Sequence, residues 1–217
     1  ISMKKKLFTS MGLMSGTSMD GIDISIIQSD GYKEFYNISD EYFEYDSDLQ
    51  RELINLRNLV LNENELLKYS LELGNLERKI TIFHAKIVDE LNLDKDVIIG
   101  FHGQTIYHNS KEKISKQLGN GKLLSQLTNK SVVFDFRKND ILNGGEGAPL
   151  TPIFHQLLIK QNEIELPICI LNIGGIANIT NIFSKEDLEL ISYDIGPGNC
   201  LLDELVRSKI NKRYDEG

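Results

Sequence analysis

Two short segments rich in glycine and hydroxyl side chains have the composition of phosphate-binding turns. The first, residues 12–23, reads Gly-Leu-Met-Ser-Gly-Thr-Ser-Met-Asp-Gly-Ile-Asp, and the second contains Gly174-Gly175. Small residues let backbone N–H groups approach a phosphate closely, and hydroxyls add donors. A plain hairpin turn would equally explain the first segment alone. With both segments present, we predict that nucleotide phosphates are bound by Ser15, Gly16, Thr17, Ser18, Asp20, Gly21, Asp23, Gly174 and Gly175.

Two carboxylates in the first segment are candidate magnesium ligands. Asp20 and Asp23 offer hard oxygen atoms that can hold Mg²⁺ directly or through water. The sequence contains neither a G-x-x-x-x-G-K-[ST] loop nor a G-x-G-x-x-G motif after a strand, the two common phosphate-binding signatures. Any nucleotide site must therefore be built from the hairpin turns. The histidines and cysteines lack zinc-ligand spacing, so we do not expect zinc.

Asp194 is the candidate general base. It is predicted to end a strand, and Gly196-Pro197-Gly198-Asn199 follows it. A carboxylate with an ordinary pKa near ~4 is ionised at neutral pH. Beside a glycine loop that admits a ligand, such a group can accept a proton during reaction. The alternative is an aspartate that caps the following loop or helix.

Polar side chains follow two other predicted strands. His102, Gln104 and Thr105 could hydrogen-bond sugar hydroxyls or an amide, or they could serve loop packing. Arg137 and Asp140 follow the next strand along the chain. Arg137 could bind a carboxylate through two parallel hydrogen bonds. A structural ion pair with a neighbouring aspartate is the other interpretation, and the sequence alone favours neither.

The elements that must position these groups alternate between strands and helices. Residues 6–28 predict a strand, a turn and a second strand, and a third strand follows Ser29-Asp30-Gly31. One helix is predicted from Ser47, with Gln50 completing a capping box. A second is predicted over residues 62–92. It has one apolar stripe at spacings of three and four, formed by Leu73, Leu76, Ile80, Phe83, Ile87 and Leu91.

The second half of the chain repeats this alternation. Strands are predicted near residues 97–101 and 131–136, and a glycine-rich loop at 143–149 leads into a helix. Three further strands are predicted at 168–173, 177–183 and 189–195, before a helix at 200–210. Cys169 stands in an apolar run, which predicts a small buried side chain.

Composition excludes several classes of protein. The 217 residues carry a net charge of −8, which argues against the clustered basic surface that binds nucleic acid. No apolar stretch reaches the ~18 residues that a membrane span requires. Two cysteines without metal spacing indicate a reducing compartment, and no apolar signal-peptide region is visible. We therefore expect a cytoplasmic protein with neither a nucleic-acid nor a membrane partner.

Taken together, five ordered blocks resemble the anhydro-N-acetylmuramic acid kinase family. They span almost the whole chain, which makes chance agreement implausible. The blocks are residues 12–23, residues 100–106 (Gly-Phe-His-Gly-Gln-Thr-Ile), residues 135–150 with Asp-Phe-Arg and Gly-Gly-Glu-Gly-Ala-Pro-Leu, residues 171–178 (Leu-Asn-Ile-Gly-Gly-Ile-Ala-Asn), and residues 194–199 (Asp-Ile-Gly-Pro-Gly-Asn).

This resemblance implies an α/β, actin-like ATPase (ribonuclease H-like) fold of two domains. Residues 1–140 would form the N-terminal domain with the first phosphate hairpin. Residues 141–217 would form the first part of the second domain, and the two phosphate hairpins would face one another across a cleft. Because family members run well beyond residue 217, the resemblance implies an incomplete second domain, and we expect this chain alone to be inactive. It also implies a homodimer.

The resemblance further implies a reaction. The family uses ATP and Mg²⁺, opens the 1,6-anhydro ring of the sugar with water and phosphorylates O6, within cell-wall recycling. Asp194 would be the base, and the sugar side would be formed by His102, Gln104, Thr105, Arg137, Asp140, Asn178, Gly198 and Asn199. A non-catalytic nucleotide-binding module, or a kinase of another sugar, would share the fold, because a fold does not fix a function.

Overall fold

The computed structural model describes residues 6–184 and 190–210. Its contacts divide the chain into two compact units, Ile1–Gly147 and Ala148–Gly217. This division falls shortly after the boundary at residue 140 that the sequence predicted. The division falls inside the glycine-rich loop and keeps residues 143–147 with the first unit. None of the described helices is both long and apolar enough to cross a membrane.

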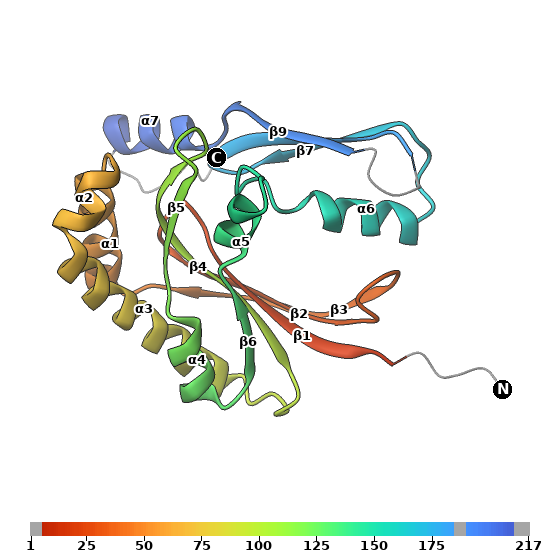
Figure 1. The fold of residues 1–217 in the computed structure, drawn as a ribbon, viewed down its shortest axis with the longest axis horizontal. Helices are drawn as coiled ribbons and strands as arrows, with labels where there is room; N and C mark the ends of the chain where they lie inside the picture. Colours follow the sequence, from red (N-terminus) through yellow and green to blue (C-terminus); the bar gives the residue numbers. More distant parts are fainter. Residues whose placement is uncertain (1–5, 185–189, 211–217) are drawn as a thin grey trace. The chain divides into compact units, whose positions relative to one another are not determined.

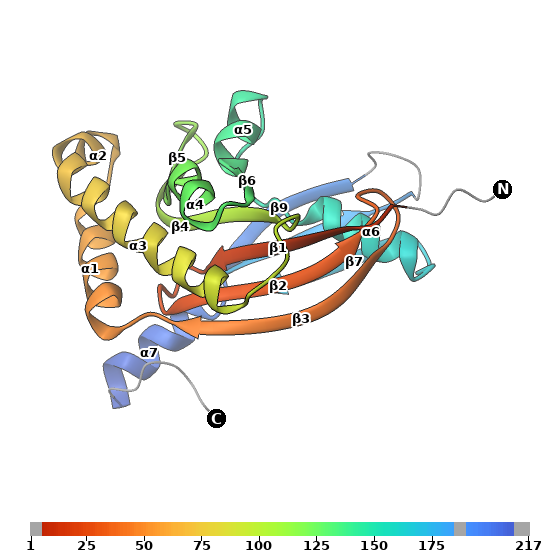
Figure 2. The same ribbon diagram turned by 90° about the horizontal axis from the view of Figure 1, so that it is seen from below.

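A six-stranded mixed sheet forms the centre of the first unit (Figure 1). Its strands are β1 (Phe8–Ser15), β2 (Gly21–Ser29), β3 (Phe35–Glu44), β4 (Ile98–Asn109), β5 (Ile114–Leu118) and β6 (Ser131–Phe134). β2 runs antiparallel to β1 and β3, which lie beside it in Figure 2, whereas β1, β4 and β6 run parallel. β5 pairs antiparallel with the second half of β4. The order β3-β2-β1-β4-β6 is that of the ribonuclease H-like fold of actin-like ATPases, as predicted.

Helices cover one face of this sheet. They are α1 (Ser47–Leu59), α2 (Glu63–Lys68), α3 (Ser70–Glu90) and α4 (Gly121–Thr128), and α5 (Phe136–Leu142) follows β6. The helix predicted over 62–92 is thus two helices that meet at Tyr69. The predicted capping box at Ser47 is also wrong. The side chain of Asp46 accepts hydrogen bonds from the backbone N–H groups of Asp48 and Leu49, because it is Asp46 that precedes the first helical residue.

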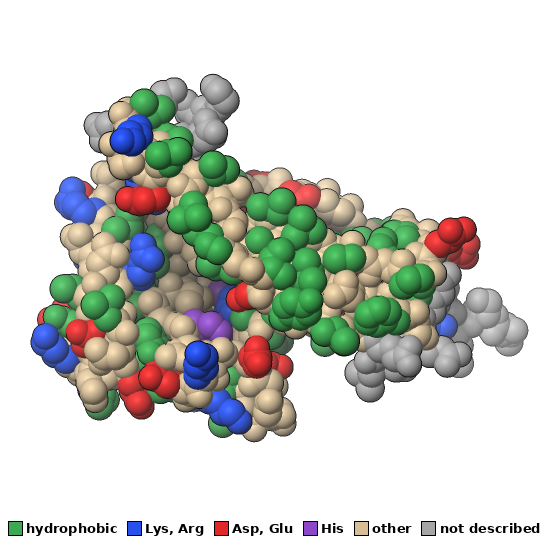
Figure 3. All heavy atoms as spheres, turned by 90° about the horizontal axis from the view of Figure 1, so that it is seen from above, with side chains coloured by type: hydrophobic (Ala, Val, Ile, Leu, Met, Phe, Trp, Pro, Cys, Tyr) green, Lys and Arg blue, Asp and Glu red, His purple; other side chains and the backbone are tan. Residues whose placement is uncertain are grey.

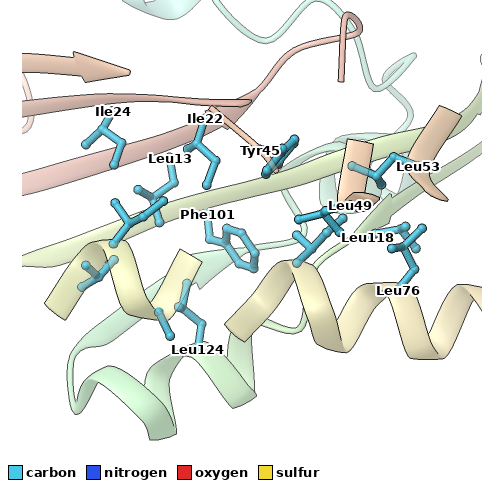
Figure 4. Close-up of a cluster of buried hydrophobic side chains, with 14 of the residues drawn as sticks. Leu13, Ile22, Ile24, Tyr45, Leu49, Leu53, Leu76, Phe101, Leu118 and Leu124 are labelled. Atoms are coloured by element: carbon cyan, nitrogen blue, oxygen red, sulfur yellow. The ribbon is translucent and has the colours of Figure 1, made fainter. Parts of the chain in front are cut away.

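The core of the first unit lies between the sheet and these helices (Figure 4). Alternate residues of β1 and β2 point into it, including Leu13, Ile22 and Ile24. The predicted apolar stripe of α3 meets them, with Leu73, Leu76, Ile80 and Ile87 all buried. Burial of apolar surface is the main driving force for folding, so this core fixes the sheet whose ends carry the candidate residues.

The second unit has a smaller core. It contains α6 (Pro152–Gln161), the antiparallel strands β7 (Ile168–Ile173), β8 (Ile176–Ile182) and β9 (Leu190–Pro197), and α7 (Cys200–Ile210). The predicted first residue of the last strand, Glu189, lies outside the described residues. Among the described hydrophobic side chains of this unit, only Pro152, Ile159, Ala177 and Ile182 are buried.

One face of the three-stranded sheet exposes apolar side chains. Leu171, Ile173, Ile191 and Tyr193 are each about half exposed, and Figure 3 shows hydrophobic side chains gathered over this sheet. Cys169 belongs to the same face and is exposed. The prediction that Cys169 is buried was therefore wrong. An apolar run does not bury its residues unless another layer packs against them, and no described element covers this face of the unit.

Candidate functional site

The turn between β1 and β2 exposes two hydroxyl groups. Thr17 and Ser18 are both exposed, and Ser18 Oγ donates a hydrogen bond to Asp20 Oδ1 at 2.5 Å. The backbone N–H of Met19 donates to the carbonyl oxygen of Gly16 at 3.3 Å. These two bonds use the Ser18 hydroxyl proton and the Met19 N–H inside the turn. The exposed Thr17 hydroxyl is the side-chain group placed to donate to an anion, and phosphate binding by the turn stays a prediction.

Ser15 and Gly21, which were also predicted to bind phosphate, are both buried. The Ser15 side chain is buried, and its Oγ lies 2.8 Å from the hydroxyl oxygen of Tyr45. Gly21 is also buried, and a Cβ atom there would lie 2.4 Å from the carbonyl oxygen of Phe43 on the neighbouring strand. Ser15 and Gly21 thus hold the ends of the turn. Any contact of theirs with phosphate must come through the backbone.

Gln104 contacts the same turn. Its side chain is fully buried, and Nε2 donates a hydrogen bond to the carbonyl oxygen of Gly16 at 2.8 Å. Its Oε1 is buried with no hydrogen-bond partner in the described part of the chain. Thr105, the next residue, accepts a hydrogen bond from Gln117 Nε2 at 3.3 Å. The geometry therefore places Gln104 beneath the predicted phosphate turn, although the sequence prediction grouped it with the sugar-binding residues.

The two candidate magnesium ligands are electrostatically coupled. Partial burial raises the pKa of Asp23, and the negative charge of Asp20 raises this pKa further. A divalent cation near both carboxylates would relieve their repulsion. Among the described residues no group of three or more His, Cys, Asp or Glu side chains could hold a metal ion. A magnesium ion at Asp20 and Asp23 would therefore need its other ligands from water and phosphate oxygens, which is its usual coordination in phosphoryl-transfer sites, and this site stays a prediction.

His102 and Arg137 form a hydrogen-bonded pair. Arg137 Nε donates to His102 Nε2 at 2.8 Å, and His102 Nδ1 lies 2.6 Å from the carbonyl oxygen of Gly103. Burial lowers the pKa of His102 to about 4, and the charge of Arg137 lowers it in the same direction. His102 is therefore neutral at pH 7. Because Nε2 accepts a hydrogen bond, its proton is on Nδ1.

The glycine-rich loop packs against this pair. Arg137 Nη1 donates to the carbonyl oxygen of Gly147 at 3.0 Å, and the backbone N–H of Gly147 donates to Asp140 Oδ2 at 2.8 Å. A Cβ atom at Gly145 would lie within 2.1 Å of that carboxylate. Arg137 and Asp140 are thus both bonded to one loop residue, and His102 fixes the orientation of the guanidinium group.

In the second unit, the Gly174-Gly175 turn is joined to the loop after β9. The carbonyl oxygen of Gly175 accepts from the N–H of Gly198 at 2.9 Å, and that of Gly174 accepts from the N–H of Asn199 at 2.8 Å. Asn199 Nδ2 also donates to the carbonyl oxygen of Ile173 at 3.2 Å. Both candidate segments of this unit, the glycine turn and the Gly198-Asn199 loop, are therefore held together by their backbones.

Asp194 lies within β9 and does not end it. The strand continues to Pro197, and a change of register between Ala177 and Asn178 marks a bulge beside Asp194. Asp194 is exposed and pairs with Asn178, which in turn pairs with Asn172 on β7. Directly paired residues share a face of a sheet. The three side chains thus form one polar row, in which Asn178 Oδ1 is buried with no hydrogen-bond partner among the described residues.

Comparison with known proteins accounts for these motifs. The family model for anhydro-N-acetylmuramic acid kinase matches residues 8–217. The chain is 59% identical over 215 residues to the anhydro-N-acetylmuramic acid kinase of Pelagibacter ubique, covering 98% of this chain. It is 38% identical to that of Agrobacterium fabrum, covering 96% of this chain. This chain belongs to the anhydro-N-acetylmuramic acid kinase family. The resemblance inferred from the five blocks is thereby confirmed.

The chain spans little more than half the length of these relatives, covering 57% of the Pelagibacter kinase and 58% of the Agrobacterium kinase. A solved structure of an Aquifex aeolicus member of the Ppx/GppA protein family is 13% identical to it. The TM-score is 0.42, and the match covers 92% of this chain and 54% of that one. A similarity of this degree supports no inference about function.

The structure brings the candidate residues together in two sets, one in each unit. The first unit carries the β1–β2 turn, Gln104 and the His102–Arg137 pair, and the second carries Gly174-Gly175 and the row that includes Asp194. That the two sets face one another across a cleft stays a prediction.

Sequence reasoning missed Tyr45, His84 and Asn172. A histidine inside the apolar stripe at residues 73–91 was the available signal for His84, since buried polar side chains require partners.

Proposed function

We propose that this chain is part of an ATP-dependent kinase that converts 1,6-anhydro-N-acetylmuramic acid into N-acetylmuramic acid 6-phosphate during cell-wall recycling. The observation that carries the proposal is the family match over residues 8–217, which contains all five motif blocks. The kinase class follows from the family, whereas the sugar and the pathway are the proposed part.

Asp194 is the proposed general base. It accepts a proton from the water molecule whose oxygen forms the new bond to C1 of the sugar. The C1–O6 bond breaks, O6 receives the γ-phosphoryl group of ATP, and ADP leaves. The exposed position of Asp194 in β9 supports this role, because an exposed carboxylate is accessible to water and substrate. Its pairing with Asn178 places an amide side chain on the same face of the sheet.

The β1–β2 turn and the Gly174-Gly175 turn are the proposed phosphate-binding elements. The backbone around Gly16 and the exposed hydroxyl of Thr17 would donate hydrogen bonds to phosphate oxygens. Ser18, whose hydroxyl donates to Asp20, would contribute through its backbone N–H. Asp20 and Asp23 would hold Mg²⁺, which neutralises negative charge on the transferred group. Positioning and charge neutralisation supply most of the catalysis in phosphoryl transfer, so these residues need not react themselves.

Arg137 is the proposed partner of the sugar's lactyl carboxylate. Its Nε and Nη1 atoms are already bonded to His102 and Gly147, and these bonds hold the guanidinium plane in one orientation. A pre-oriented guanidinium binds a carboxylate with less loss of side-chain entropy. His102 would thus act on the sugar through Arg137. Asp140, Thr105, Asn178, Gly198 and Asn199 are proposed to complete the sugar side.

Replacing the proposed base tests the reaction directly. In the natural protein, including any sequence that continues past Gly217, Asp194→Asn should lower the rate of anhydrosugar phosphorylation by about 10²- to 10⁴-fold. The fold should be retained, since the side chain is exposed. ADP release coupled to a spectrophotometric assay gives the rate, and Asp203→Asn, in the first turn of α7, is the matched control.

The outcomes separate the competing functions. Unchanged turnover in Asp194→Asn would reject this residue as the base. Nucleotide binding without sugar-dependent ADP release would indicate a non-catalytic module. ADP release that depends on a different sugar in a substrate panel would retain the kinase and reject the proposed substrate.

A further inference from the structure

We propose that Tyr45, His84 and Gln104 form a buried support that sets the backbone of the β1–β2 turn and thereby controls nucleotide affinity without contacting the nucleotide. The inference rests on the proposed function only in taking this turn as a phosphate-binding element. No motif pointed to Tyr45 or His84, and Gln104 was predicted to bind the sugar.

Tyr45 contacts both ends of the turn. Its hydroxyl lies 2.8 Å from Ser15 Oγ, at the last residue of β1. Its backbone N–H donates to the carbonyl oxygen of Asp20, immediately before β2, at 2.8 Å. The ring is buried among the core side chains of Figure 4 and packs edge-on against Phe83, with ring centroids 5.2 Å apart. Since this ring cannot move without disturbing the core, the ends of the turn are fixed relative to each other.

His84 fixes the direction of the hydrogen bonds beneath the turn. Its Nδ1 lies 2.8 Å from the carbonyl oxygen of Ile80, which can only accept, so Nδ1 carries the proton. Nε2 is then an acceptor, and it lies 3.4 Å from Ser15 Oγ. Ser15 thus donates to His84 and accepts from the hydroxyl of Tyr45. The fully buried ring of His84 also packs edge-on against Phe101, which keeps Nε2 aimed at Ser15.

Gln104 provides the third point of attachment. Its Nε2 bonds to the carbonyl oxygen of Gly16, the first residue after β1, at 2.8 Å. A carbonyl held from below fixes the orientation of the peptide plane that it shares with the N–H of Thr17. That N–H is one of the donors proposed to meet phosphate. Gln104 can therefore act on the nucleotide through the peptide plane between Gly16 and Thr17.

The cost of this arrangement argues for a role beyond packing. Tyr45, His84 and Gln104 each expose 3% of their surface or less, and so does Ser15. Burying polar groups costs free energy that apolar side chains of similar shape would not incur, and Gln104 Oε1 is left without a described partner. These polar groups meet at the end of the core that borders the turn. Pre-organised donors at that place would strengthen anion binding.

The test distinguishes an effect on nucleotide binding from an effect on sugar binding. In the natural protein, with any sequence beyond Gly217, Tyr45→Phe and Gln104→Leu should each raise the KM for ATP by about tenfold, the scale of one lost buried hydrogen bond. The KM for the anhydrosugar should change less than twofold. The dissociation constant of a fluorescent ATP analogue should rise in parallel. Thr128→Val removes a buried hydroxyl bonded to Leu124 in α4, away from the turn, and serves as the matched control that moves neither constant.

Each outcome decides between named alternatives. A rise in the sugar KM alone in Gln104→Leu would make Gln104 a sugar ligand and overturn the inference, as would unchanged ATP constants in both variants. If Gln104→Leu does not fold, Tyr45→Phe, which removes one hydroxyl, carries the test. If the unsubstituted protein binds the ATP analogue but does not phosphorylate the anhydrosugar, the proposed substrate is wrong, and the affinity comparison still tests the support. Absence of nucleotide binding would overturn both.

Discussion

His84 and His102 are both kept neutral by their surroundings, and each then accepts a hydrogen bond at Nε2. Burial is the main cause for both, and it lowers the pKa of each from 6.5 to about 4. A charged imidazole could not accept these hydrogen bonds, because both of its nitrogens would be donors. The contacts to Ser15 and Arg137 therefore depend on the neutral form.

This burial predicts an acid-dependent loss of stability. In the unfolded chain a histidine binds its proton near pH 6.5, whereas folded His84 does so only near pH 4. Between these values the unfolded state holds more protons, so the free energy of unfolding falls as pH falls through that window. The contribution of His84 is fully present above about pH 6.5, and roughly 3 kcal/mol is lost by pH 4.

Urea unfolding at pH 7, 6 and 5 measures this effect. Carboxylates also titrate on acidification, so His84→Phe is the reference, because it keeps a ring against Phe101 and removes the titrating group. We expect the stability of the variant to fall less steeply between pH 7 and 5. Parallel pH profiles for the two proteins would contradict the assignment.

At the scale of elements, turns are held by close backbone approach. Gly198 lies so near the Gly174-Gly175 turn that a Cβ atom would be 2.3 Å from the carbonyl oxygen of Gly174. No side chain fits at that distance, so glycine is required there for packing. Gly198, within the sequence motif at residues 194–199, is thus required by a backbone contact, in addition to any contact that the motif makes with a ligand.

This contact predicts different effects for two glycine substitutions in the same unit. Gly198→Ala should force the two turns apart at a cost of about 1–3 kcal/mol, typical of an overpacked site. Gly174→Ala should be mild, since a Cβ atom there would lie 3.6 Å from its nearest neighbour. Amide hydrogen exchange of residues 198 and 199, whose N–H groups bond to this turn, should accelerate only in Gly198→Ala. Equal exchange in both variants would show that the contact is unimportant.

At the scale of the whole molecule, the two units differ in how much apolar surface they bury. The large core of the first unit is formed by residues between Met11 and Leu124. The second unit exposes Leu171, Ile173, Ile191 and Tyr193 on one sheet face. A chain segment folds independently only if the surface it buries offsets its loss of conformational entropy.

We therefore expect residues 1–147 to fold when expressed alone, with a cooperative thermal transition seen by circular dichroism. Residues 148–217 alone should show no such transition, or should aggregate through the exposed sheet face. A cooperative transition of the isolated second segment would mean that its core is larger than the described residues indicate.

The sequence by itself did not predict β5, α4 or α5, but it determined most of the other elements and the family. These follow from local patterns: alternation in β1 and β2, the apolar stripe of α3, and glycines at fixed spacing. The sequence prediction was wrong at the cap of α1, where the side chain of Asp46 accepts the hydrogen bonds. It was also wrong for Cys169, which is exposed because no described layer packs against its face of the sheet. The position of Asp194 within β9 also required the strand pairing.

Only the tertiary structure separated groups that face the turn from groups that hold it. Ser15, Thr17 and Ser18 look alike in sequence, yet Ser15 is buried against Tyr45 while the other two are exposed. Gln104 is 88 residues from Gly16 along the chain and bonds to it. The parallel pairing of β1 with β4 brings them together. Contacts of this kind depend on long-range strand pairing, which no local residue pattern predicts.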